Sequence, residues 1–315
     1  MEILDLRHFS SSDLRRLLDE EVELWGALLS WDYRGSTDMI LRYVDAKILP
    51  GYAAVERGSI AGYCFFVYEG SKGVIGDLYV SRTRHDTREI ETKLLQHVIE
   101  TLQESPGVHR IEAQLLTHLT GELAAPFLSN GFQRHRRLFL ELQLAGDGAP
   151  PFPPVRPLKD TPIRRWTEHD YQSAASVITA AYRSHIDSEI NDQYRTNAGS
   201  MRFLNNIVRF PGCGVFDNES SFVAIHKPSG ALIGLILCSR IRHDVGHVTQ
   251  VCLLPEHRGA GIGENLMLAS YNALRSRGLT QLSLTVTEAN RNAVELYRRI
   301  GFQEERVFDA FVWEG

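Results

Sequence analysis

The two halves of the sequence share one order of expected helices and strands, and this duplication is the strongest constraint on the fold. In the first half, a helix that begins at Ser12 is followed by apolar strand-like runs, a second helix, a strand, a short helix and a last strand. The second half repeats this order. The run "LYV" at 78–80 matches "VCL" at 251–253, and "GF" at 131–132 matches "GF" at 301–302, with nearly equal offsets. We therefore expect two similar domains in tandem rather than a solenoid of many short repeats.

Helices and strands are expected in every part of the chain. In the first half, the patterns predict strands at 3–6, 51–57, 60–70, 74–81, 110–116 and 137–144, and helices from Ser12, at 88–102 and at 125–132. In the second half, they predict strands at 163–166, 221–227, 231–241, 246–254, 282–287 and 306–313, and helices at 169–183, 201–208, 263–277 and 292–299. The expected fold class is α+β, with a mixed, mainly antiparallel sheet flanked by helices in each domain.

A proline-rich segment separates the two halves. Prolines stand at 150, 151, 153, 154, 157 and 162. Because proline fixes φ and removes a backbone donor, this segment is a poor helix or central strand and a good semi-rigid linker. The predicted organisation is a first domain over 1–145, a linker over 146–160 and a second domain over 161–315.

Composition excludes several classes of protein. With 43% apolar residues the chain can bury ordinary cores, but it has no apolar run of membrane-spanning length and no signal-peptide pattern at its start. The net charge of −5 is mild, and no block of lysine and arginine occurs. We expect a cytoplasmic protein that binds neither nucleic acid nor membrane and acts on a small molecule or a peptide.

The cysteines give no sign of a metal or a disulfide framework. The four residues, Cys64, Cys213, Cys238 and Cys252, are widely scattered and show no ligand spacing. Buried, reduced thiols and the absence of a metal site are the expectation.

A glycine-rich loop in "PEHRGAGIGENLM", residues 255–267, is the clearest candidate site. The loop leads into an expected helix, whose first N–H groups lack partners and attract anions. Gly259, Gly261 and Gly263 let the backbone approach a ligand closely, and Arg258 adds a permanent cation. A pyrophosphate suits such a loop. The spacing GxGxG and the residues Glu264 and Asn265 exclude a Rossmann loop and a nucleotide-binding P-loop.

Two motifs of the second half resemble those of the GCN5-related N-acetyltransferase (GNAT) family. The segment "VCLLPEHRGAGIGENLM" is similar to the acetyl-CoA signature of that family. Downstream, "VTEANRNAVELYRRIGF" resembles its second motif, and the positions that match are Val286, Asn290, Ala293, Leu296, Tyr297, Gly301 and Phe302. The resemblance implies two tandem acyl-CoA N-acyltransferase folds, with acetyl-CoA as acyl donor and no metal. The implied cofactor-binding residues are Val251, Cys252, Leu253, Arg258, Gly259, Ala260, Gly261, Ile262, Gly263, Asn290 and Tyr297.

The resemblance also implies catalytic roles. One backbone N–H of the strand at 251–253 would stabilise the oxyanion of the thioester carbonyl. Tyr297 is the expected general acid for the leaving sulfur. His247, four residues before Val251, is the candidate general base, and Glu288 or a chain of waters is an alternative.

The first half departs from the family at the corresponding loop. Its segment "LYVSRTRHDTREIETKLL" has no glycine, so the side chains of Arg84, His85, Asp86 and Thr87 would occupy a phosphate loop. No tyrosine stands at the position of Tyr297. We expect a degenerate GNAT-like domain without cofactor, which could support the active domain, shape its acceptor site or form a homodimer.

The acceptor cannot be read from a motif. The segment "AAYRSHIDSEINDQYR", residues 180–195, is the candidate wall of its site, with Tyr182, His185, Asp187 and Tyr194 as substrate-binding residues. Its acidity suits a cationic amine. The expected activity is acetyl transfer to a primary amine of a small molecule or amino acid derivative by direct attack on the thioester. A protein or peptide N-acetyltransferase and a catalytically silent acyl-CoA-binding regulatory protein remain as alternatives. Tandem GNAT architecture also occurs in mycothiol synthases, but no other motif selects that substrate.

Overall fold

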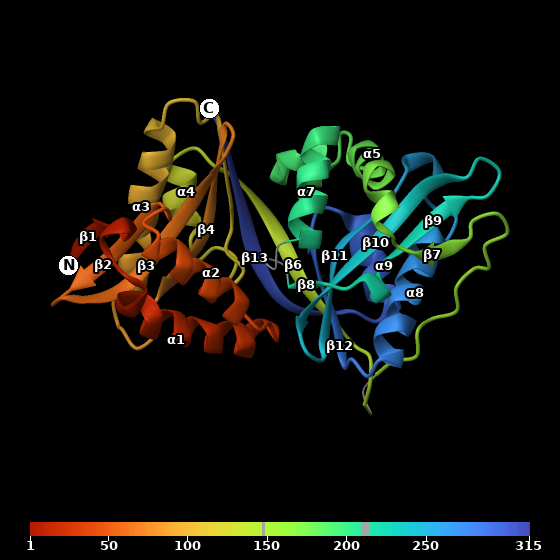
Figure 1. Ribbon diagram of the computed structural model, residues 1–315, viewed down its shortest axis with the longest axis horizontal. Helices are drawn as coiled ribbons and strands as arrows, with labels where there is room; N and C mark the ends of the chain where they lie inside the picture. Colours follow the sequence, from red (N-terminus) through yellow and green to blue (C-terminus); the bar gives the residue numbers. More distant parts are fainter. Residues whose placement is uncertain (147–148, 210–213) are drawn as a thin grey trace. The chain divides into compact units, whose positions relative to one another are not determined.

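The chain forms two compact units, which Figure 1 shows coloured along the sequence. The computed structural model describes residues 1–146, 149–209 and 214–315. The first unit comprises Met1–Arg137 together with Val307–Gly315, and the second comprises Leu138–Arg306. The chain therefore passes from the first unit to the second within strand β6, Gln133–Gln143, and returns within strand β13, Gln303–Glu314. The predicted boundary at 145 differs from this division because sequence patterns do not show that one strand can belong to two units.

The first unit is a mixed, mainly antiparallel sheet with helices on both faces. Its strands follow the order β1-β2-β3-β4-β5, and the end of β13 pairs with β5. The strands are β1 Glu2–Asp5, β2 Gly51–Glu56, β3 Ser59–Glu69, β4 Lys72–Val80 and β5 Arg110–Gln114, and the helices are α1 Ser11–Leu29, α2 Arg34–Asp45, α3 Thr87–Glu104 and α4 Ala124–Ser129. Side chains alternate across the sheet: Cys64 and Phe66 belong to the core under α3, whereas Tyr63 packs with the apolar faces of α1 and α2.

The second unit repeats this plan. Its strands follow the order β6-β12-β11-β10-β9-β7, and β8 pairs with β10. The strands are β7 Ile163–Arg165, β8 Val215–Phe216, β9 Phe222–His226, β10 Ala231–Arg242, β11 Val245–Leu253 and β12 Gln281–Thr287, and the helices are α5 Tyr171–Ala181, α6 Ile186–Ile190, α7 Asn197–Arg209, α8 Ile262–Ser276 and α9 Arg291–Ile300.

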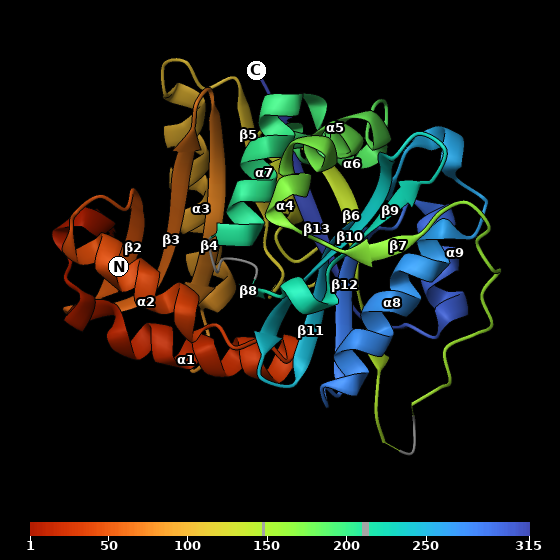
Figure 2. The same ribbon diagram turned by 45° about the vertical axis from the view of Figure 1, so that its right-hand side comes forward.

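Alternation along β10 places a helix layer on each face of the second unit. Leu235 and Leu237 are buried in one cluster with the apolar residues of α5 and α7, which lie side by side in Figure 2. Cys238 follows Leu237 along the strand and interacts with Ser270 of α8, which covers the other face. The expected order of elements is therefore present. The helices α2 and α6, and the short strand β8, were not predicted.

A parallel strand pair that separates part-way is common to both units. In the second unit, the ladder between β11 and β12 ends at the pair Val248–Leu284, next to a bulge in β11 at Thr249. In the first unit, the ladder between β4 and β5 ends at Ile75–Ala113, next to a bulge at Gly76. Bulges bend a strand and end its pairing. In both units a bulge stands next to the end of the parallel ladder, at matching positions, which agrees with the duplication expected from the sequence.

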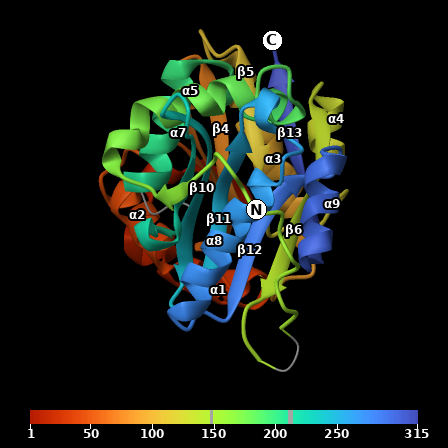
Figure 3. The same ribbon diagram turned by 90° about the vertical axis from the view of Figure 1, so that its right-hand side faces the viewer.

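The proline-rich segment is packed onto α8 instead of spanning open solvent. The ring of Phe152 lies 5.1 Å from that of Tyr271, and Asn265 Nδ2 donates to the carbonyl of Arg156 at 2.9 Å. Figure 3 shows this segment in yellow-green as it leaves the lower end of β6. Residues that were expected to act as a spacer are thus part of the surface of the second unit.

The described cysteines Cys64, Cys238 and Cys252 are free and buried, as expected, and Cys213 lies outside the described residues. Within residues 1–146, 149–209 and 214–315, no group of three or more His, Cys, Asp and Glu side chains could hold a metal ion. None of the described helices has both the length and the apolar character needed to cross a membrane.

Candidate functional site

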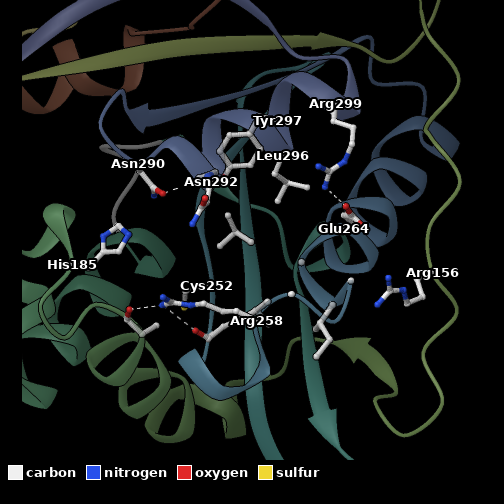
Figure 4. Close-up of a pocket in the computed structure, with 18 of the residues that line it drawn as sticks. Arg156, His185, Cys252, Arg258, Glu264, Asn290, Asn292, Leu296, Tyr297 and Arg299 are labelled. Atoms are coloured by element: carbon white, nitrogen blue, oxygen red, sulfur yellow. Dashed lines mark hydrogen bonds and ion pairs between the residues drawn. The ribbon is translucent and has the colours of Figure 1, made fainter.

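A cavity of about 730 Å³ in the second unit collects most of the residues singled out from the sequence. Its walls come from β11, the loop before α8, the first turns of α8, helix α9 and the end of α5 (Figure 4). Every residue predicted to bind the cofactor lines this cavity except Ala260. The structure therefore brings the two sequence motifs to one place.

The glycine loop presents the bare N-terminus of α8 to the cavity. Gly261 is the N-cap residue with φ +83°, and Gly259 has φ +77°, so both are in the left-handed region that favours glycine. No side chain in the described parts of the chain caps the first N–H groups of α8. Unpaired N–H groups and the helix dipole make this end of the helix suitable for an anion.

Beside the loop, β11 has an edge that β12 does not cover. The ladder with β12 stops at Val248, whereas the antiparallel ladder with β10 continues to Leu253. Val251, Cys252 and Leu253 line the cavity beyond this point. A backbone edge of this kind can accept an extended ligand as if it were another strand.

Helix α9 places Tyr297 against the same cavity. Asn290 caps the helix through its side chain, which accepts from the N–H of Ala293 at 3.4 Å. Tyr297 lies two turns further on, is only 6% exposed and lines the cavity. Burial, together with the nearby Asp187 and Cys252, raises the pKa of its phenol. The hydroxyl therefore stays protonated at neutral pH and is suited to donate a proton.

Comparison with known proteins identifies this arrangement. A family model described as the acetyltransferase (GNAT) family matches residues 185–302. A mycothiol acetyltransferase from Thermobifida fusca is 31% identical over 198 residues, which cover 56% of this chain and 56% of that protein. The chain thus spans little more than half the length of this curated relative.

Two solved structures share the fold along nearly the whole chain. A GCN5-related N-acetyltransferase from Sphaerobacter thermophilus is 16% identical with a TM-score of 0.67, covering 99% of this chain and 95% of that one. A tandem GNAT protein from the clavulanic acid biosynthesis pathway is 16% identical with a TM-score of 0.62, covering 99% of this chain and 98% of that one. Residues 185–302 thus match the GNAT family, and the chain as a whole shares the fold of a tandem GNAT protein.

Within the second GNAT domain, Arg258 takes a different position from the one expected for a phosphate ligand. Its Nη2 donates to the carbonyl of Ala181 at 2.6 Å and lies 3.4 Å from the carbonyl of Leu253. Figure 4 shows both contacts as dashed lines. Arg258 thus ties the end of α5 to the end of β11. The sequence motif located this residue in the loop but could not give the direction of its side chain.

His247 does not lie where a base for this GNAT site is needed. It is not among the residues that line the cavity, and it is buried with its Nδ1 2.8 Å from the hydroxyl of Ser283. Burial lowers the pKa of His247 to about 3. A general base must reach the proton it removes, so neither the position nor the pKa suits the predicted role.

The predicted acceptor wall divides into residues that face the cavity and residues that support them. Tyr182 and His185 line the cavity, and Tyr194 stacks behind Tyr182 with ring centroids 4.3 Å apart. The backbone N–H of Asp187 donates to His185 Nδ1 at 3.2 Å, and the Asp187 carboxylate accepts from Thr287. Because Nδ1 accepts this hydrogen bond, a neutral His185 ring carries its proton on Nε2.

Several residues of the cavity were missed from the sequence. Asn292 and Arg299 come from α9, and Pro154 and Arg156 come from the proline-rich segment. The spacing of α9 could have indicated Arg299, which follows Asn292 by seven residues on the same helix. No pattern in the sequence indicates that the proline-rich segment returns to the glycine loop.

In the first GNAT-like domain, the corresponding loop is closed by its own side chains. Arg84 forms ion pairs with Asp86 at 2.9 Å and with Glu56 at 2.6 Å. Asp86 is the N-cap residue of α3. The guanidinium of Arg84, which could otherwise bind an anion here, is therefore paired with two carboxylates.

Proposed function

We propose that the second GNAT domain is an acetyl-CoA-dependent N-acetyltransferase that acts on a primary amine of a small molecule or an amino acid derivative. The observation that supports this most directly is the continuity of one cavity. It joins the uncapped N-terminus of α8, the free edge of β11 and the buried phenol of Tyr297. These three features match the pyrophosphate, the pantetheine arm and the thioester of acetyl-CoA in that order.

The residues around the loop fit a pyrophosphate. Gly261 stands where a Cβ atom would lie 3.3 Å from Arg156 and would also be strained by φ +83°. The only acidic side chain of the first turn of α8, Glu264, forms an ion pair with Arg299, which offsets its repulsion of phosphate. The donor supplies the acetyl thioester, and the chain supplies the groups that hold and polarise it.

The chemistry needs one proton donor and one stabilised oxyanion. The amine nitrogen attacks the thioester carbon, a C–N bond forms and the C–S bond breaks. A backbone N–H of the free β11 edge would stabilise the oxyanion of this attack. Tyr297 gives its phenolic proton to the departing sulfur and regains one that originates on the attacking amine and passes through water. The products are an amide and free CoA thiol, so atoms and charge balance.

The glycine loop provides the first test. A Gly261→Glu variant places a negative side chain at the anion site, so acetyl-CoA should no longer raise its melting temperature. Gly278→Glu is the matched control, because Gly278 follows the other end of α8, has φ +80° and has open space around it. Both variants carry the same strain and charge, but only the first should lose acetyl-CoA binding. Equal stabilisation of Gly261→Glu and the wild type by acetyl-CoA would refute the assignment of the loop.

The acceptor is identified by a screen for release of free CoA thiol across small amines, amino acids and peptides. The relative named mycothiol acetyltransferase supports a small molecule as the acceptor. The polar wall of Tyr182 and His185 supports an amine that carries its own hydrogen-bonding groups. Turnover with peptides alone would show that the acceptor class proposed here is wrong, and binding of acetyl-CoA without turnover of any acceptor would favour the silent alternative.

A further inference from the structure

Three arginines line the cavity, and two of them are occupied by other groups. Arg258 donates to backbone carbonyls, and Arg299 is paired with Glu264. The third, Arg156, comes from the proline-rich segment, and within the described residues its guanidinium has no hydrogen-bond or ion-pair partner. Figure 4 shows Arg156 on the side of the cavity next to the glycine loop.

The backbone of Arg156 is fixed against the start of α8. Asn265 Nδ2 donates both to the carbonyl of Arg156, at 2.9 Å, and to the carbonyl of Gly261, at 2.8 Å. The Cβ atom of Arg156 lies 3.3 Å from the point where Gly261 would carry its own Cβ. One side chain thus joins the proline-rich segment to the N-cap of the helix.

A second contact holds the segment further along the same helix. Phe152 packs on Tyr271 with ring centroids 5.1 Å apart, and the Tyr271 hydroxyl is 3.5 Å from the carbonyl of Pro150. Prolines at 150, 151, 153 and 154 restrict φ between this contact and Arg156. These contacts and prolines fix the backbone of Arg156 before a ligand binds. Ligand binding therefore costs little backbone entropy at this residue.

We propose that Arg156 is the side chain that binds the pyrophosphate of acetyl-CoA, and that the proline-rich segment is a functional part of the cofactor site. This inference rests on the proposed function. The N-terminus of α8 supplies backbone donors but only a partial charge, whereas a pyrophosphate carries full negative charges. A guanidinium next to Gly261 supplies the cation that Arg258, turned toward carbonyls, does not.

Titration calorimetry on the full chain tests the proposal by direct binding. The proteins are the wild type, Arg156→Ala, Arg156→Lys and Lys159→Ala, and the ligands are acetyl-CoA and its form without the 3′-phosphate. Lys159→Ala is the matched control, because it removes one exposed cation from the same segment outside the cavity. We expect Arg156→Ala to weaken binding of both ligands about tenfold, since a charge-assisted contact to phosphate is lost. Lysine should restore part of the loss, and the difference should shrink in high salt.

The outcomes separate this proposal from the proposed function. Wild-type affinity of Arg156→Ala for both ligands would overturn the role of Arg156 while leaving the acetyltransferase assignment intact. A loss seen only with acetyl-CoA would assign Arg156 to the 3′-phosphate and would also overturn the proposal. An equal loss of affinity in Lys159→Ala would show that the effect comes from the overall positive charge of the segment, and it would also overturn the specific role of Arg156. If the wild type binds neither ligand, the proposed function itself fails.

Discussion

Tyr297 is a buried residue that also lines the cavity of the proposed reaction. Its ring packs edge-on against Phe302 with centroids 5.8 Å apart, and the residue lines the cavity. In the described parts of the chain, no side chain or backbone group hydrogen bonds to this hydroxyl. The phenol is thus held rigidly by its ring and left available for a ligand atom.

Replacing Tyr297 by phenylalanine tests its role as acid. The ring contacts remain and the proton donor is lost, so kcat should fall by about 10² while the Kd for acetyl-CoA changes little. Steady-state kinetics and titration calorimetry measure the two quantities. Tyr43→Phe is the control, because Tyr43 is an exposed tyrosine on α2 of the first unit and does not line the cavity. Turnover of Tyr297→Phe at the wild-type rate would contradict the assignment.

At the residue scale, the sequence predicts what is local and misses what depends on side-chain direction. The sequence singles out Gly261 and Tyr297, which line the cavity, because a loop before a helix and a helical face are short-range patterns. The direction of Arg258 depends on Ala181, and the burial of His247 depends on Ser283 and Phe139. These partners are far away in the sequence, so no local pattern indicates them.

At the scale of elements, β6 holds a carboxyl group whose titration affects stability. Glu141 is partly buried on β6, and burial, followed by the charge of Glu305 on β13, raises its pKa from 4.5 to about 7. Between pH 4.5 and about pH 7, Glu141 therefore holds a proton in the folded state that it has lost in the unfolded state. Its stabilising contribution is therefore complete below about pH 4.5 and is lost as the pH rises through about 7.

Glu141→Gln removes this dependence. At pH 8 the variant should exceed the wild type by about 1–2 kcal/mol in free energy of unfolding, after allowance for solvent screening, and at pH 5 the gain should be much smaller. Urea unfolding at the two pH values measures the difference. Glu304→Gln is the control, since Glu304 is exposed and paired with Arg298. A gain in Glu141→Gln that does not change with pH would show that the carboxyl titrates normally.

The elements themselves were largely predictable, because apolar periodicity and glycine or proline boundaries identify most helices and strands. The proline-rich segment shows the limit of this reasoning. Its composition correctly excludes a helix and a sheet strand. Its packing on Tyr271 and Asn265 follows from the surface of α8, which the segment's own residues do not reveal.

At the scale of the whole molecule, the first unit depends on residues from the other end of the described chain. Ala310–Glu314 pair with Arg110–Gln114, and Phe311 stacks on Phe127 with ring centroids 4.1 Å apart. Inside the same unit, Asp309 accepts from the backbone of Gly121 at 2.7 Å. A fragment that ends near residue 145 therefore lacks part of its own core.

Deleting Val307–Gly315 should destabilise the first unit by several kcal/mol, because β5 loses one of its two strand partners and Phe127 loses a buried contact. Hydrogen exchange read by mass spectrometry would show faster exchange in β4 and β5. Segments of β10 and β11 are the internal control, because no residue of the second unit is removed. Unchanged exchange in β5 would show that the strand from β13 is dispensable.

The late arrival of β13 has a consequence for synthesis on the ribosome. Arg110 and Glu314, which form an ion pair across the β5–β13 ladder, are 204 residues apart. At translation rates of about 5–20 residues per second, β13 is synthesised roughly 10–40 s after β5. During that time the nascent chain exposes an unpaired strand edge, which can pair with other chains. The order of synthesis therefore leaves the edge of β5 open to such pairing until β13 has been made.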